Sequence, residues 1–97
     1  ECKTAIEMDP EFGNAWNDLG AYLLEQGQFD EAVFYLKRAT RCKNYTTYWY
    51  PHYNLSRVWL KKGMLGKALA SLYKSLEANP NFTPAINALN HLARKVN

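Results

Sequence analysis

The sequence predicts an all-α protein made of antiparallel helix pairs stacked on one another, and three observations support this prediction. Apolar residues recur at the three- and four-residue spacing of helices, and no stretch alternates as a strand would. A shift of 36 residues superposes two matching sets, Leu19, Gly20, Leu23 and Gly27 on Leu55, Ser56, Trp59 and Gly63. A shift of 70 residues superposes two more, Ala5, Ile6, Glu7 and Pro10 on Ser75, Leu76, Glu77 and Pro80. One helix-pair unit therefore recurs along the chain.

The expected elements are a helix tail over 1–9 and then helices over 13–26, 29–42, 50–62, 65–78 and 83–95. Gly27 and Gly63 each follow the first helix of a pair, because a left-handed residue that ends a helix is usually glycine. Asp30 and Glu31 favour the start of the helix that follows Gly27, since acidic side chains interact well with a helix N-terminus. Pro84 suits the first turn of the last helix.

Gly20 lies in the middle of the expected helix over 13–26, where glycine costs about 1 kcal/mol relative to alanine. It falls on the apolar stripe, and Ser56 takes the same place in the next unit. Each faces an alanine of the following helix, Ala32 or Ala68. We interpret these small residues as points where two antiparallel helices approach closely, so that packing offsets the lost helix propensity.

Composition excludes several classes of function. The 97 residues, 47% of them hydrophobic, suffice for one small domain with a packed core. The net charge of +3 is lower than nucleic-acid binders usually carry, and no apolar run approaches the ~20 residues that cross a bilayer. Cys2 and Cys42 are expected to be reduced thiols, with a disulfide as the alternative. His52 and His91 fall in different units, and no zinc spacing, phosphate loop or nucleophile set occurs. We therefore expect that the protein is not an enzyme and that it binds neither a metal ion nor a cofactor.

The repeated unit resembles the tetratricopeptide repeat, whose 34-residue pattern is W-x2-L-G-x2-Y, then A-x3-F, then P. The first repeat matches it at Trp16, Leu19, Gly20, Leu23, Ala32 and Leu36. The second repeat matches it at Leu55, Ser56, Trp59, Ala68, Leu72 and Pro80. His52 stands in the second repeat where the pattern has its packing aromatic, so a structural role is expected for this histidine.

This resemblance implies a single domain over 1–97, built as a short right-handed solenoid. Its parts are the end of a preceding repeat (1–12), a repeat (13–46), a second repeat preceded by a two-residue insertion (47–82) and a terminal capping helix (83–97). In the capping helix Asn90 stands where a small residue is usual. A polar residue suits a helix with nothing stacked behind it, so we expect Asn90 to face solvent.

In this family the first helix of each repeat lines a concave groove, and the resemblance therefore implies where a partner binds. Seven residues on that face are the expected site: Asn17, Asp18, Tyr50, Tyr53, Asn54, Arg57 and Asn87. Asparagine amides both donate and accept hydrogen bonds, and tyrosines add flat contact area, which suits an extended peptide. We expect Tyr53 and Arg57 to point away from the core, so that replacing both with alanine changes stability little.

Two other interpretations of these residues stay open. In the first, the face is an ordinary solvated surface. In the second, the aromatic side chains of "NYTTYWYPHY" (44–53) fold onto the repeat core. One known groove chemistry is not expected, because family members that clamp the C-terminal carboxylate of a chaperone partner use five lysine, asparagine and arginine side chains. Only Asn54 matches that set, and the other positions hold Asn17, Ala21, Pro84 and Ala88.

The expected function is a non-enzymatic protein–protein interaction module that binds a peptide or protein segment in the groove. The alternative is a structural solenoid segment of a larger protein, which mediates assembly through its ends or convex face. Self-association is then expected at the N-terminal end, around Ile6 and Met8. RNA binding is supported only by Lys37, Arg38, Arg41 and Lys43, which lie away from the groove and suit the dipole of their helix.

We accordingly expect neither a nucleic-acid nor a membrane partner. The first residues are polar and already helical in pattern, which indicates that the chain begins inside a helix. No signal peptide is recognisable in this stretch. The cytoplasm is the favoured location, although the sequence does not specify a compartment.

Overall fold

A computed structural model describes residues 11–41 and 49–96 of the chain, and both ranges are helical apart from short turns. The helices are α2 (Glu11–Glu25), α3 (Phe29–Thr40), α4 (Trp49–Lys61), α5 (Leu65–Ala78) and α6 (Thr83–Val96). They agree with the expected helices to within two residues at each end. The expected helix tail over 1–9 and both cysteines lie outside the described residues.

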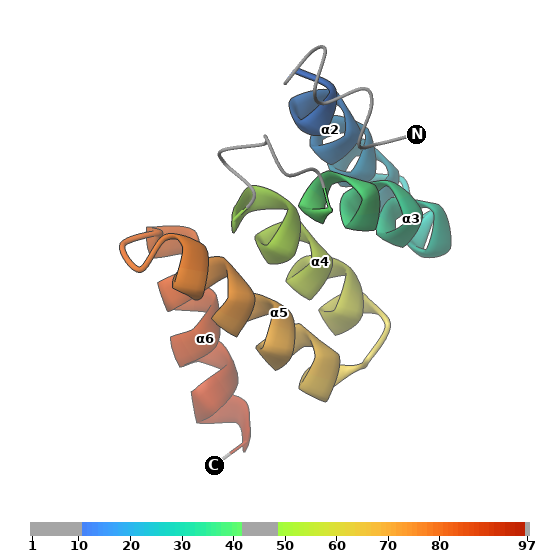
Figure 1. The fold of residues 1–97 in the computed structure, drawn as a ribbon. Coiled ribbons are helices and arrows are strands. Elements are labelled where there is room, and N and C mark those ends of the chain that lie inside the picture. Colours follow the sequence, from blue (N-terminus) through green and yellow to red (C-terminus); the bar gives the residue numbers. More distant parts are fainter. Residues whose placement is uncertain (1–10, 42–48, 97) are drawn as a thin grey trace.

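Two antiparallel helix pairs form the repeats, α2 with α3 and α4 with α5, and α6 follows as a last single helix (Figure 1). Gly27 and Gly63 make the turns within the pairs with φ of 81° and 77°. In the first turn, the Gln28 amide donates to the carbonyl of Leu23 at 2.9 Å. In the second, the Met64 amide donates to the carbonyl of Trp59 at 2.8 Å. Both glycines therefore end their helices in the left-handed conformation that the sequence predicts.

The buried apolar residues form a core that runs through the stack. One cluster joins the two helix pairs and contains Leu23, Leu24, Ala32, Leu36, Leu55, Val58, Trp59 and Ala68. A second cluster joins α5 to α6 and contains Leu72, Phe82, Ala85 and Leu92. Leu19 departs from its expected place on the buried stripe, since 37% of it is exposed. The reason is its position on α2, which is the first helix of the described stack.

The small residues Gly20 and Ser56 lie on the buried sides of the first helices of the repeats. A Cβ atom on Gly20 would lie 2.5 Å from Cγ of Leu36, so only glycine fits beside that side chain. The expected neighbour, Ala32, contributes its backbone carbonyl oxygen at 3.4 Å. The tight contact is therefore made by Leu36 and not by the alanine side chain. Ser56 is fully buried, and its hydroxyl donates to the carbonyl of Tyr53.

The outer side of α6 is polar, as expected for the last helix of a stack. Asn90 is exposed, which confirms its predicted orientation, and Ala93 is exposed as well. Leu92 lies on the opposite side of the helix and is buried against α5. Among the helices of 11–41 and 49–96, none has both the length and the apolar character that crossing a membrane requires.

Candidate functional site

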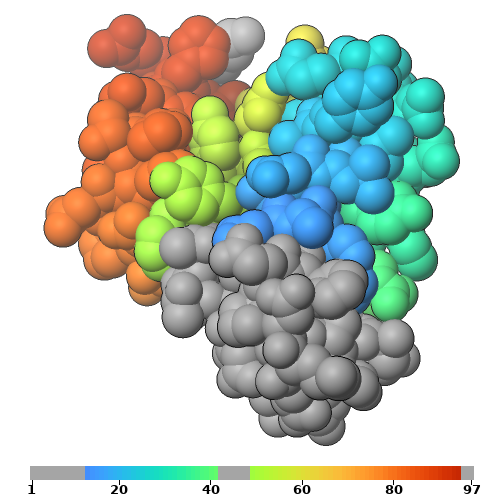
Figure 2. Space-filling model, turned by 90° about the horizontal axis from the view of Figure 1, so that it is seen from above, coloured from blue at the N-terminus to red at the C-terminus, as the bar shows by residue number. Residues whose placement is uncertain are grey.

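The first helices of the two repeats, α2 and α4, lie side by side. Figure 2 shows yellow-green atoms of α4 between the blue atoms of α2 and the orange-red C-terminal part of the chain. Direct packing of α2 against α4 agrees with this view. We call the face of α2, α4 and α6 on which the sequence predicts partner binding the concave groove.

Four polar side chains connect α2 and α4 across the groove. Asn54 Nδ2 donates to Asn17 Oδ1 at 2.9 Å, and Arg57 Nη1 donates to Asn54 Oδ1 at 3.0 Å. Arg57 Nη2 then donates to the carboxylate of Glu25 at 2.5 Å, which forms an ion pair. We call Asn17, Glu25, Asn54 and Arg57 the polar network. Three of these four residues belong to the expected site, and Glu25 does not. Glu25 joins them through its contact with Arg57, which lies 32 residues further along the sequence.

Burial differs strongly along the polar network, and this sets what each residue can do. Asn54 is only 7% exposed, so its amide serves mainly to orient its neighbours. The Arg57 and Glu25 side chains are 36% and 63% exposed, and solvent therefore weakens their ion pair. Two of the five guanidinium N–H groups of Arg57 are used in these bonds, which leaves three for a bound acceptor. The network thus presents fixed donors at the middle of the groove.

Two tyrosines of the expected site pack onto a buried phenylalanine. The ring of Tyr50 meets Phe82 edge-on with centroids 5.0 Å apart, and Tyr53 does so at 5.4 Å. Tyr53 is half-buried within the second core cluster, so the expectation that it points away from the core is wrong. The turn before α6 brings Phe82 onto the start of α4, where the Phe82 ring covers the Tyr53 side chain. Tyr50 remains 43% exposed.

The remaining expected site residues do not join the network. Asp18 on α2 and Asn87 on α6 are exposed, and within the described ranges neither makes a hydrogen bond or ion pair with it. The structure therefore brings Asn17, Asn54 and Arg57 together and places Tyr50 and Tyr53 against Phe82. Tyr45 and Tyr48 of the aromatic-rich stretch lie outside the described residues.

His52 lies on α4 and is half-buried, in keeping with a structural histidine. Burial lowers the pKa of its imidazole below the ordinary value of 6.5, and the positive charge of Lys74 lowers it further. The neutral ring is therefore favoured in the folded chain. In the part of the chain that the structure describes, no group of three or more His, Cys, Asp and Glu residues could hold a metal ion.

The lowered pKa of His52 predicts a loss of stability in mild acid. Because the folded state binds this proton more weakly than the unfolded chain, the stabilising contribution is complete above pH 6.5 and is lost as the pH falls below it. Urea denaturation should show that the free energy of unfolding falls as the pH is lowered from about 7.5 to about 5.5. His52→Gln should reduce this fall, whereas an equal fall in both proteins contradicts the assignment.

Comparison with known proteins finds two repeat matches, of which the second coincides with the pair of α4 and α5 and the first ends within α3. One tetratricopeptide repeat model matches residues 1–34 and a second matches residues 51–82, together about two thirds of the chain. No curated protein matches it. Repeats of this kind generally mediate protein–protein interactions and are typically not enzymes. With its paired helices, its small residues at the close contacts and these two matches, the chain belongs to the tetratricopeptide repeat family.

Proposed function

We propose that the chain is a non-enzymatic module that binds an extended peptide or protein segment in the concave groove. The polar network is the observation that supports this proposal most directly. Its hydrogen bonds hold Asn17 and Arg57 in place before any partner arrives, which lowers the entropy lost on binding. An extended segment offers backbone carbonyls for the free donors of Arg57 and for the side-chain amide of Asn17.

The aromatic end of the groove adds apolar contact beside these donors. Tyr50 exposes 43% of its surface, and its ring is held by Phe82, so it offers a flat contact area at low entropic cost. Tyrosine and arginine are the residue types that most often dominate binding energy at interfaces. We therefore place the centre of the proposed contact between Tyr50 and Arg57. Asp18 and Asn87 line its edges in this proposal.

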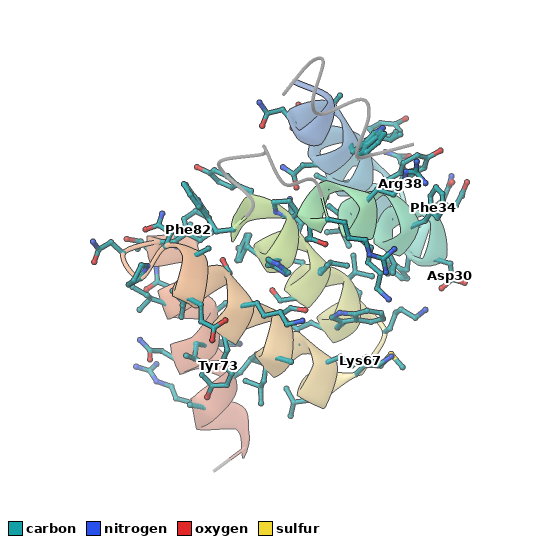
Figure 3. All side chains as sticks on the ribbon, in the orientation of Figure 1. Asp30, Phe34, Arg38, Lys67, Tyr73 and Phe82 are labelled. Carbon is teal, nitrogen blue, oxygen red and sulfur yellow. The ribbon has the colours of Figure 1, made fainter. Side chains whose placement is uncertain are left out.

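A structural role in a larger solenoid is the second candidate, and exposed apolar side chains favour it. Phe34 on α3 and Tyr73 on α5 are each more than half exposed, and both lie on second helices of the repeats (Figure 3). Contacts with another domain would cover such side chains. The N-terminal end around Ile6 and Met8, expected to mediate self-association, lies outside the described residues.

The groove proposal can be tested with peptides selected from a displayed random library against the 97-residue chain. We expect Arg57→Ala to weaken the selected peptides about tenfold, as loss of a central interface residue does. Lys74→Ala removes an exposed cation from α5, a second helix outside the expected groove face, and should leave affinity unchanged. Fluorescence anisotropy with a labelled peptide measures both affinities.

Tyr53 needs a gentler substitution than alanine, because its ring is part of the core. Tyr53→Phe keeps the contact with Phe82 and removes only the hydroxyl, so the variant should stay folded.

The side-chain amide resonances of Asn17 and Asn54 supply a direct readout of peptide binding. If those resonances do not respond, or if Arg57→Ala and Lys74→Ala weaken binding equally, the peptide does not occupy the groove.

A further inference from the structure

A second hollow opens on the side of the molecule that is formed by the second helices of the repeats. It lies between α3 and α5, which flank α4 in Figure 1, and has a volume of about 440 Å³. His52 and Trp59 of α4 contribute to its lining, together with four cationic side chains, Lys37, Arg41, Lys67 and Lys74. Among the described residues, no carboxylate lines it. We call this feature the basic hollow.

The positive charge of the basic hollow is not neutralised within the described residues. Lys62 nearby pairs with Asp30, whereas none of the four lining cations forms an ion pair in 11–41 or 49–96. Lys37 and Lys67 approach the same Trp59 ring, at 6.0 and 4.8 Å from its centroid. Like charges gathered in this way repel one another and attract an anion.

The placement of Lys67 also indicates a role other than helix stability. It lies in the first turn of α5, which contains no acidic residue (labelled in Figure 3). A cation at a helix N-terminus is unfavourable because the helix dipole is positive there. Lys74 follows two turns later and lines the same hollow. A bound anion would interact favourably with both lysines and would account for their positions.

The chemistry of the lining favours carboxylates over nucleotide bases. Single-stranded RNA is usually held by aromatic rings whose faces are open for base stacking. Trp59 is only 8% exposed, and lysine side chains already approach its ring. The hydroxyl of Ser71 also lines the hollow and can donate to a carboxylate oxygen, whereas the hydroxyl of Thr40 already donates to the carbonyl of Lys37.

We propose that the basic hollow binds an acidic peptide segment, whose side-chain carboxylates lie between the cations of α3 and those of α5. Alternate side chains of an extended peptide are about 7 Å apart on one face, so two carboxylates can engage both helices. This site lies on the other side of α4 from the polar network. The two proposals therefore concern different surfaces and can be tested independently of each other.

A labelled peptide of alternating glutamate and glycine is the probe, with its glutamine counterpart as the uncharged control. We expect the glutamate peptide alone to bind, and Lys67→Gln with Lys74→Gln to weaken it about three- to tenfold. The matched variant Lys61→Gln with Arg94→Gln removes the same charge from other surfaces and should bind as the wild type does. All four side chains are exposed, and circular dichroism verifies folding.

His52 gives an independent readout, because an anion between Lys74 and the imidazole favours the protonated ring. Binding of the glutamate peptide should therefore raise the pKa of His52 in an NMR titration, while ring resonances of His91 on α6 should not respond to the peptide. Equal weakening by both double variants would overturn the proposal, as would an unchanged His52 titration. Tighter binding of oligouridine than of the peptide would overturn it in favour of RNA.

Discussion

Phe82→Ala is expected to lower the free energy of unfolding by about 3–5 kcal/mol, the usual cost of truncating a buried phenylalanine. Phe82 is 8% exposed and belongs to the cluster that joins α5 to α6. It also supports the rings of Tyr50 and Tyr53 at the start of α4. Its removal therefore opens a cavity between three helices at once. Because domains of this size are stable by roughly 5–15 kcal/mol, the variant should approach the limit of folding.

Urea denaturation of Phe82→Ala at low temperature measures this loss, with Tyr73→Ala as the matched control. Tyr73 is an aromatic residue of the neighbouring helix that is 57% exposed, so its truncation should change stability by about 0.5 kcal/mol or less. Phe82→Leu should fall between the two. A Phe82→Ala variant within about 1 kcal/mol of the wild type would show that Phe82 does not hold α4 and α6 together.

The helices and their pairing could be predicted because they depend on local and repeated signals. Gly27 and Gly63 adopt the left-handed conformation that ends a helix, and this requirement is visible in the residue type alone. The recurrence of Gly20 as Ser56 predicts two buried positions for small residues, and both positions are buried in the structure. Leu19 is the exception, because helical periodicity places it on the apolar stripe although 37% of it is exposed in the structure.

The site was predictable only in part, because its contacts join residues far apart in sequence. Helical periodicity places Asn54 and Arg57 on one face of α4, but it cannot show that Glu25 reaches Arg57. Nor does it show that the turn before α6 covers Tyr53, which changes that residue from a surface contact to a core residue. The basic hollow is a similar case, since Lys37 and Lys67 are 30 residues apart and approach the same Trp59 ring only because α3 and α5 both pack against α4.

Gly20→Leu is expected to lower the free energy of unfolding by about 1–3 kcal/mol through overpacking. Even a single Cβ atom at this position would lie 2.5 Å from Cγ and 2.6 Å from Cδ2 of Leu36. Leu36 is fully buried and cannot swing into solvent, so α2 and α3 must separate to admit a larger side chain. The gain in helix propensity over glycine, about 1 kcal/mol at most, does not offset this separation.

Two further variants separate this clash from a general effect of replacing glycine, and urea denaturation measures all of them. Gly66 lies in α5 with nothing within 4 Å of the position that a Cβ atom would take, so Gly66→Ala should stabilise the chain by about 0.5–1 kcal/mol. Leu36→Ala combined with Gly20→Leu should cost less than the sum of the two single changes, since the new leucine can fill the vacated space. Additive costs, or a Gly20→Leu variant as stable as the wild type, would show that α2 and α3 are not in contact at this point.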